Sequence, residues 1–324
     1  MRRPSRRTVL ATALGAALPA PPAPGAAGRL RVLEREHRAR LGVFAWDTGS
    51  GARLGYRSGE RFAMCSVFKT LAVAAVLRDL GEDVLSRVVH YDEGDVDRAG
   101  GAPVTGQPGN LAAGMTVAEL CGAAVSYSDN TAANLLLEQL GGPVAVTRLC
   151  RSVGDEVTRL DRWEPELNSA EPGRATDTTT PLAIATTYAR LTVGHALDAT
   201  GRRRLTGWLL ACTTGGERIR AGLPGDWTVG DKTGTGGYGT ANDVAVAWPP
   251  SRAPLVVAVL STHADAAAAA DSPLVGKAAA IVADAFEHGD ARVRSQPGHS
   301  KTPSPQPDFR NETGTVLFRS QPLV

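Results

Sequence analysis

A serine and a lysine three positions apart open a strongly apolar segment of the chain. Ser66 and Lys69 stand in the run 64-MCSVFKTLAVAAVL-77, where almost every other side chain is apolar or small. On a helix these two side chains share a face, and a helix N-terminus favours negative charge. A hydroxyl placed there beside an amine can be an activated nucleophile. The alternative is a lysine that extends to solvent from the first turn of a core helix.

Two later motifs again combine a hydroxyl with polar or cationic groups. Ser128-Asp129-Asn130 opens a segment of helical periodicity that stops at Gly141. Lys232-Thr233-Gly234-Thr235 lies in a stretch of strand character, before a glycine-rich turn. Each has a plain structural alternative. Ser, Asp and Asn are favoured helix N-caps, and a lysine on an exposed edge strand blocks unwanted strand pairing.

A long irregular stretch carries a further acid and amide. Glu164 and Asn168 lie within residues 162–180, which are punctuated by Pro and Gly and show no period. A loop that long in a compact domain is usually functional; the alternative is a solvated polar loop. The chain has no G-x-S-x-G motif, so a Ser-His-Asp hydrolase with a nucleophile elbow is without support.

Periodicity and turn signals predict the elements that must position these residues. Helices are expected over 29–40, 66–80, 117–125, 130–140, 143–153, from 181 to about 210, and 275–286. Strands are expected over 42–47, 53–56, 228–234, 243–248 and 255–260.

The order of these elements predicts an α/β fold class with two lobes. Residues 28–60 and 211–289 are expected to pair into one α/β lobe, and residues 61–210, including the loop 162–177, into an all-helical lobe. The cleft between the lobes is the default site. Residues 290–324 are rich in Pro, Ser and Gln, which is typical of a disordered tail.

Composition and charge limit the kinds of partner and cofactor that we expect. The 324 residues are 43% hydrophobic and 21% charged, as in ordinary globular proteins. The net charge of +2 depends on four arginines in residues 1–27; without them 31 basic residues face 33 acidic ones. No basic excess then remains for nucleic acid. The histidines and cysteines are scattered, so we expect no metal or organic cofactor. The state of the four cysteines stays open: Cys65, Cys121, Cys150 and Cys212.

Residues 1–27 predict an export signal. Ser5–Leu10 resembles a twin-arginine box, a short apolar run follows it, and small residues end the stretch. The run is too short to span a bilayer, so we expect an exported, periplasmic or secreted, protein with no stable membrane insertion. The alternative is simply a basic N-terminus.

The motifs occur in a fixed order: Ser66-x-x-Lys69, Ser128-Asp129-Asn130, Glu164-x-x-Leu167-Asn168 and Lys232-Thr233-Gly234. From Arg29 to about Phe286 the chain therefore resembles the class A serine β-lactamases, whose signature includes S-x-x-K, S-D-N and K-T-G. The resemblance implies an antiparallel sheet with flanking helices, plus an all-helical lobe. It also implies a monomeric hydrolase that confers antibiotic resistance, with a small-molecule β-lactam as substrate.

The resemblance further implies roles for the site residues. Ser66 would be the nucleophile, deprotonated either by Lys69 or by Glu164 through a water, a choice that stays open. Ser128 would pass a proton to the leaving lactam nitrogen. Backbone N–H groups of Ser66 and Thr235 would hold the oxyanion. The remaining groups would bind the substrate: Asn130, Asn168, Lys232, Thr233, Gly234 and Arg218.

In the same family pattern, Glu164 with Asn168 would activate the water that breaks the acyl-enzyme. Arg162 and Asp177 would clamp the two ends of the loop that carries Glu164. The nearest alternative, a D-alanyl-D-alanine peptidase of the same fold, lacks the deacylating glutamate. A β-lactam sensor, which acylates only once, usually has a membrane segment, and none is visible after the signal.

The chain departs from the family pattern at several positions. The strand that often carries a carboxylate-binding arginine reads Ala241-Asn242-Asp243-Val244 here, so Arg218 is expected to substitute, as in some members. Gly101 stands where many members have an aromatic at the cleft mouth. The usual disulfide partner of Cys121 is replaced by Val73, and that of Cys65 by Gly236. Neither family disulfide is therefore expected.

Overall fold

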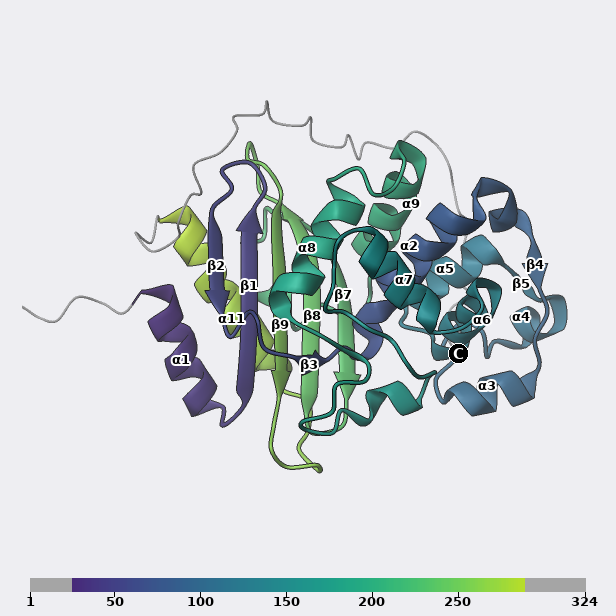
Figure 1. The fold of residues 1–324 in the computed structure, drawn as a ribbon, viewed down its shortest axis with the longest axis horizontal. Coiled ribbons are helices and arrows are strands. Elements are labelled where there is room, and N and C mark those ends of the chain that lie inside the picture. The colour runs from purple at the N-terminus through teal and green to yellow at the C-terminus, as the bar shows by residue number, and fades with distance from the viewer. Residues whose placement is uncertain (1–24, 289–324) are drawn as a thin grey trace, which may run out of the picture.

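A five-stranded antiparallel sheet forms the centre of one lobe (Figure 1). The computed structural model describes residues 25–288. The strand order is β2-β1-β9-β8-β7, with the bounds β1 Arg40–Asp47, β2 Arg53–Tyr56, β7 Thr228–Gly236, β8 Thr240–Trp248 and β9 Leu255–Thr262. Because β1 pairs with β9 along its whole length, an early and a late segment of the described residues share one sheet.

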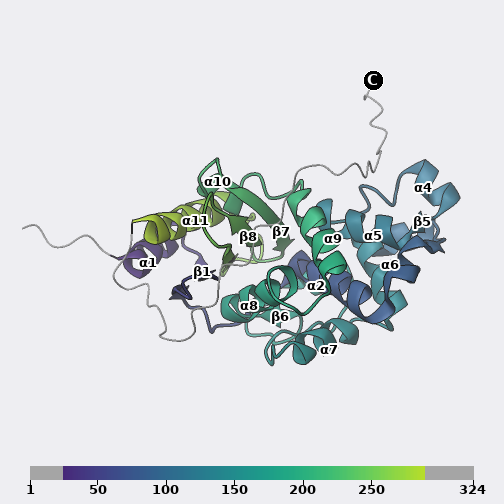
Figure 2. The ribbon, with the colours of Figure 1, turned by 90° about the horizontal axis from the view of Figure 1, so that it is seen from above.

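The sheet separates two hydrophobic cores. Successive side chains of a strand point to opposite faces, and in β9 Val256 and Ala258 enter one core while Val257 and Val259 enter the other. Helices α1 (Ala26–Glu36) and α11 (Ser272–Glu287) cover one face, and α8 (Pro181–Thr192) lies on the opposite face (Figure 2). An apolar run without a polar side is therefore the right pattern for β9, which is buried on both faces.

Helix α2 (Phe68–Ala75) is the centre of the helical lobe. All its residues are buried, as expected for a helix that is apolar nearly all round, with Lys69 as its charged member. It packs against helices on several sides: α5 (Val117–Ser126), α6 (Asn130–Leu140), α7 (Val144–Ser152) and α9 (Ala199–Leu210). Three shorter helices complete the described elements of this kind: α3 (Glu93–Ala99), α4 (Pro108–Ala113) and α10 (Ile219–Gly222).

The α/β fold class is confirmed, and the lobes differ in detail from the expectation. The region expected to be all-helical also holds two short ladders, β3 (Phe62–Ala63) with β6 (Thr178–Thr179) and β4 (Val88–Val89) with β5 (Met115–Thr116). Helix α8, expected in the helical lobe, lies against the sheet. The helix expected over 66–80 begins as the 3₁₀ turn Cys65–Val67 and ends as the π-helical turn Val76–Leu80.

Two predicted segments fall largely outside the described residues. Residues 1–24 of the expected export signal and the whole expected tail 290–324 lie there. The last residues of that signal, Ala26 and Ala27, open helix α1. Among residues 25–288, no helix is both long and apolar enough to cross a membrane.

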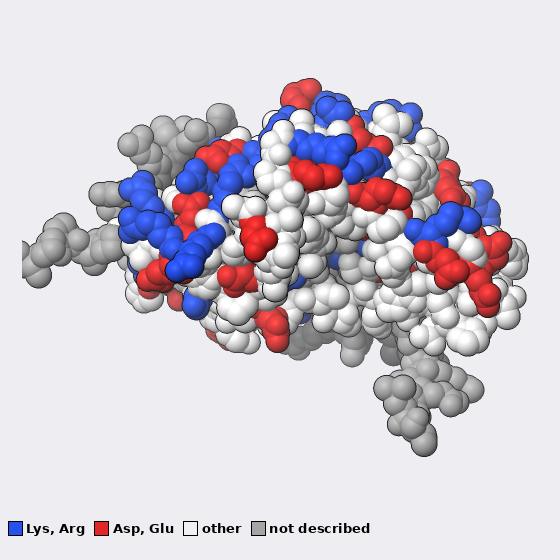
Figure 3. Space-filling view, turned by 90° about the horizontal axis from the view of Figure 1, so that it is seen from below, with Lys and Arg blue, Asp and Glu red and all other residues white. Residues whose placement is uncertain are grey.

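Basic and acidic side chains are interspersed over the face of the molecule seen in Figure 3, with no broad area of one sign.

Candidate active site

Ser66 lies at the junction of the two lobes. It stands in the 3₁₀ turn that leads into α2 and is 8% exposed. Strand β7 runs close beside this turn: a Cβ added at Gly234 would meet the Met64 carbonyl at 2.9 Å and the Ser66 nitrogen at 3.3 Å. Only glycine permits that approach, since contacts under 3.0 Å force the backbone to shift. The K-T-G glycine thus brings β7 up to the candidate nucleophile.

Lys69 is fully buried, so it does not extend to solvent. Its Nζ lies 3.0 Å from Glu164 Oε1 and donates to Asn130 Oδ1 at 2.6 Å and to the Ser128 carbonyl at 2.8 Å. Burial lowers the pKa of Lys69, and the neighbouring Glu164 carboxylate opposes that shift. These contacts answer the question raised by the sequence: the buried ammonium is paired inside a polar site.

Ser128 and Lys232 form the opposite side of the site. Lys232 Nζ donates to Ser128 Oγ at 3.0 Å and to the Thr233 carbonyl at 2.9 Å. Burial lowers the pKa of Lys232 to about 8, and repulsion from Lys69 contributes to the shift. Lys232 stands on edge strand β7 but is 0% exposed, so it does not serve as an edge-blocking surface lysine.

The S-D-N motif caps a helix and faces the site at the same time. Asp129 is the N-cap of α6 and accepts from the Ala132 nitrogen at 2.8 Å. It also accepts from the nitrogens of Val104 and Thr105. Both readings of the motif therefore hold, since the capping aspartate fixes the backbone from which Ser128 and Asn130 extend.

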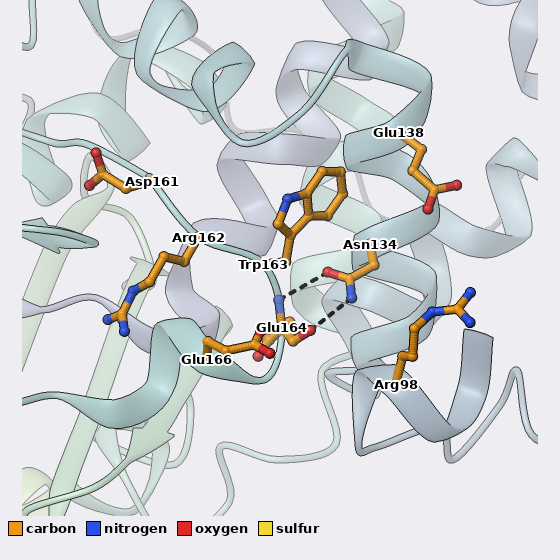
Figure 4. A pocket seen from close by; sticks show the side chains of 8 residues that line it. All are labelled: Arg98, Asn134, Glu138, Asp161, Arg162, Trp163, Glu164 and Glu166. Carbon is orange, nitrogen blue, oxygen red and sulfur yellow. Dashed lines mark hydrogen bonds between the residues drawn. The ribbon is translucent and has the colours of Figure 1, made fainter. Parts of the chain in front are cut away.

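Glu164 faces Ser66 from the irregular loop. Ser66 Oγ donates to Glu164 Oε1 at 3.3 Å, and the amide of Asn168 donates to the other carboxylate oxygen. The backbone of Glu164 is held on both sides by Asn134, which accepts from its nitrogen at 3.0 Å and donates to its carbonyl at 2.9 Å (Figure 4). Sequence reasoning gave Asn134 no role, although it lies one helical turn after Asn130.

An ion pair closes this loop at its base. Arg162 Nε donates to Asp177 Oδ2 at 2.6 Å, and the other Asp177 oxygen accepts from the Asp161 and Arg162 nitrogens. Asp177 is 1% exposed. The clamp expected between the two ends of the loop is present.

Arg218 lies beside the exposed end of β7. Its Nη2 donates to Thr235 Oγ1 at 2.7 Å, and Nη1 donates to the carbonyls of Gly234 and Asn242 at 2.9 and 2.7 Å. Burial lowers its pKa. The β8 strand, which lacks an arginine at 241–244, supplies the Asn242 carbonyl that holds Arg218. Thr235 remains exposed next to this guanidinium. This arrangement suits a carboxylate.

Sequence reasoning assigned no role to two further groups, Asp243 next to Arg218 and Thr214 next to Thr233. Asp243 is fully buried, and its Oδ2 accepts from the Ile219 nitrogen at 3.0 Å, next to Arg218. Burial, with the nearby Asp231 carboxylate, raises the pKa of Asp243 well above its usual range. Thr214 shares a 2.5 Å hydroxyl contact with Thr233. The sequence could have pointed to Asp243, because it is an acidic residue within the otherwise apolar strand 241–248. Nothing in the sequence singled out Thr214.

The described residues hold no cluster of His, Cys, Asp or Glu that could bind a metal ion. All four cysteines are free and buried. A Cβ at Gly236 would lie 2.7 Å from Cys65 Sγ, so that position abuts the thiol without bridging it. Burial raises the pKa of the Cys65 thiol to about 12, which makes it a poor nucleophile beside Ser66.

The geometry places a hydroxyl, two ammonium groups of lowered pKa and a carboxylate within one buried cluster. Such a set can generate a nucleophile and move protons. Comparisons with known proteins agree with that chemistry. The model of the β-lactamase enzyme family matches residues 26–286. A β-lactamase of Streptomyces lavendulae is 60% identical over 88% of this chain and 98% of its own length, and one of Streptomyces fradiae is 61% identical over 88% and 97%.

Solved structures give the same assignment. The β-lactamase from Streptomyces albus G has a TM-score of 0.79 and 61% identity over 80% of this chain and 98% of that one. A mutant of a class A β-lactamase representing the last common ancestor of Gram-negative bacteria has a TM-score of 0.78 and 52% identity over 82% and 100%. The chain therefore belongs to the β-lactamase enzyme family, and within it to the class A enzymes.

Proposed function

We propose that the protein hydrolyses the β-lactam amide of penicillins and cephalosporins through an acyl-enzyme on Ser66, and so confers antibiotic resistance. The observation that carries this proposal is the Glu164 carboxylate, 3.3 Å from Ser66 Oγ and 3.0 Å from Lys69 Nζ. A carboxylate beside the nucleophile can activate water for the second half of the reaction. A peptidase or a sensor that acylates only once does not need it.

In acylation, Ser66 Oγ attacks the lactam carbonyl and loses its proton to Lys69, or to Glu164 through a water. Glu164 Oε1 lies 3.3 Å from Ser66 Oγ and 3.0 Å from Lys69 Nζ, and the choice between the two bases stays open. The C–N bond of the lactam then breaks, and the nitrogen takes a proton from Ser128. Ser128 regains a proton from Lys69, 3.5 Å from its Oγ, which passes on the proton taken from Ser66. Lys232, 3.0 Å from Ser128 Oγ, orients that hydroxyl. A lowered pKa suits both lysines to proton transfer near neutral pH.

The oxyanion of each tetrahedral intermediate would rest between the backbone N–H groups of Ser66 and Thr235. Such a pair is worth about 10²–10³ in rate per donor. The close approach of β7 at Gly234 supports this assignment, because it brings the two backbone segments together.

The substrate carboxylate would bind at the exposed end of β7. Thr233 and Thr235 offer hydroxyls, and the Arg218 guanidinium lies 2.7 Å from Thr235 Oγ1. Asn130 would orient the acyl amide of the substrate. Its Oδ1 already accepts from Lys69, and its amide nitrogen donates to the Ala99 carbonyl at 3.0 Å.

Deacylation would use Glu164 as the general base toward water, and the ester to Ser66 breaks as the water oxygen joins the carbonyl carbon. Asn168 donates to the carboxylate, and Asn134 fixes the backbone behind it. The proton returns to Ser66 Oγ and regenerates the enzyme.

The test is turnover of a chromogenic cephalosporin by protein covering residues 28–324, beside Glu164→Ala. The matched control is Glu166→Ala, which removes an exposed glutamate from the same loop. Glu164→Ala should lower kcat about 10²–10⁴-fold and accumulate an acyl-enzyme visible by intact-mass spectrometry, whereas Glu166→Ala should turn over normally. A single stoichiometric burst from the unmodified protein would indicate a peptidase or a sensor instead.

We propose export by the twin-arginine route from residues 1–27, on the basis of Ser5-Arg6-Arg7-Thr8-Val9-Leu10 and the apolar run after it. Replacing Arg6 and Arg7 by Lys should leave the protein in the cytoplasm of an expressing bacterium. Undiminished export of that variant would rule out this route.

A further inference from the structure

The connection between helices α9 and α10 carries a threonine, Thr214, that the proposed reaction does not use. Both neighbours of Thr214 are fixed. Thr213 donates from its nitrogen and its hydroxyl to the carbonyl of Ser126, the last residue of α5, at 2.9 and 3.0 Å. A Cβ added at Gly215 would lie 1.9 Å from Asp231 Oδ2 of β7, a closeness that only glycine allows. Thr214 is therefore held between the helical lobe and β7.

The Thr214 hydroxyl lies in a chain of three hydrogen-bonding groups that ends on β7. Its Oγ1 is 2.5 Å from Thr233 Oγ1 and 3.4 Å from Cys212 Sγ. The first distance is that of a direct O–H···O hydrogen bond and leaves no space for a water between the two hydroxyls. The side chain of Thr214 thus contacts a residue of the K-T-G motif directly.

The direction of these hydrogen bonds depends on what Thr233 binds. A hydroxyl has one hydrogen to donate, and a carboxylate can only accept. When Thr233 donates to the substrate carboxylate, it must therefore accept from Thr214. Burial raises the pKa of the Cys212 thiol, so Cys212 keeps its proton near neutral pH and can donate to Thr214 in turn. All the hydrogens then point toward the anion, and hydrogen bonds in such a chain strengthen one another.

Thr235, the second hydroxyl of the proposed carboxylate site, has an equivalent arrangement. Arg218 Nη2 donates to Thr235 Oγ1 at 2.7 Å, so the hydroxyl hydrogen of Thr235 is left for another acceptor. Thr214 supplies to Thr233 what Arg218 supplies to Thr235. Each hydroxyl that would meet the substrate carboxylate then has a donor behind it.

We propose that Thr214 is a positioning residue for the substrate carboxylate. By donating to Thr233, it leaves the Thr233 hydroxyl hydrogen to the substrate and raises the preference of the enzyme for β-lactams that carry a carboxylate. This inference rests on the proposed function, in which Thr233, Thr235 and Arg218 bind that carboxylate. Thr214 acts through Thr233 and takes no part in the proton transfers.

The test compares a chromogenic cephalosporin with its methyl ester, which lacks the negative charge. The kcat/KM for the acid divided by that for the ester gives the preference for the carboxylate. Thr214→Val, which keeps the side-chain shape, should lower this ratio about three- to tenfold by raising KM for the acid, as expected for the loss of one hydrogen bond. Thr214→Ser, which keeps the hydroxyl, should retain the ratio of the unmodified protein.

Two comparisons separate this role from a merely structural one. In a Thr233→Val background, Thr214→Val should lower the ratio no further, because the group through which it acts is gone. Thr228→Val, which removes an exposed threonine hydroxyl at the start of β7, should leave the ratio unchanged. A loss of general packing would instead lower kcat/KM for the acid and the ester alike.

The inference alone is overturned if Thr233→Val lowers the ratio and Thr214→Val does not. It is also overturned if Thr214→Val has the same effect with and without the Thr233 hydroxyl, because Thr214 would then act independently of Thr233. If Thr214→Val fails to fold, Thr214→Ala carries the same predictions. Failure of the proposed function has a different signature, since the unmodified protein would then not turn over either substrate repeatedly.

Discussion

The buried ammonium of Lys232 should set the alkaline limit of catalysis. Burial and repulsion from Lys69 lower its pKa from 10.5 to about 8, which corresponds to about 3 kcal/mol of bias against the charged form. Because the ammonium is the form that attracts the substrate carboxylate and donates to Ser128, kcat/KM should fall as pH rises through about 8. Beyond that midpoint each pH unit should cost about tenfold.

The control that isolates this group is Lys232→Arg, since arginine stays protonated throughout the accessible range. Its kcat/KM will be lower at every pH because a guanidinium differs in shape from an ammonium. The comparison therefore uses the pH dependence of kcat/KM in each enzyme and not its absolute value. Stopped-flow hydrolysis of a chromogenic cephalosporin from pH 6 to 10 measures both enzymes. The alkaline limb should be present in the unmodified protein and absent below about pH 10 in Lys232→Arg.

The same shift predicts a stability effect of defined sign. The pKa of Lys232 is lower in the folded state than in the unfolded chain, so the folded state holds fewer protons between pH 8 and 10.5. The unfolding free energy should therefore rise with pH across this window, relative to Lys232→Arg. If kcat/KM of Lys232→Arg also falls as pH rises through about 8, the assignment of this decrease to Lys232 is refuted. Another group, such as Lys69, would then be responsible.

Three further outcomes follow from contacts in the site. Arg218→Ala should raise KM for benzylpenicillin more than tenfold through loss of a charged hydrogen bond; an unchanged KM would remove its assignment. Asp243→Asn should change the unfolding free energy in urea by less than about 1 kcal/mol, because burial favours the neutral carboxyl; a loss above about 3 kcal/mol would indicate a buried charge. Gly236→Ala would place a Cβ 2.6 Å from the Asn168 carbonyl, so it should destabilise the fold by about 1–3 kcal/mol and slow deacylation. Unaltered thermal unfolding and kcat would contradict that contact.

Local signals explain which elements the sequence predicts well. Helix α6 is predicted with its observed bounds, because Asp129 caps its start and Gly141, at φ +82°, ends it. Helices α3 and α4 were not predicted, since they are short and bury almost none of their side chains, and α3 depends on a capping box between Asp92 and Asp95. The expected helical segment 181–210 divides in two, and Asp198 caps the second helix.

The site residues likewise fall into those that a local motif predicts and those that only the fold identifies. Ser66, Lys69, Ser128 and Lys232 could be named in advance because each stands in a short motif. The groups that hold them depend on contacts between distant segments, such as Asn134 with Glu164 or the Asn242 carbonyl with Arg218. No local pattern encodes such pairs, so only the folded chain identifies them.

The shared position of the site between the two lobes has a consequence for following the folding of this protein. Ser66, Ser128, Glu164 and Lys232 come from four segments of the chain, and each lies more than 30 residues from the next. Contacts between such distant segments form late and slowly. A helical lobe or a sheet folded alone would have native-like circular dichroism but no complete site. Recovery of turnover during refolding would therefore time the docking of β7 onto the Ser66 turn, a step to which probes of secondary structure are blind.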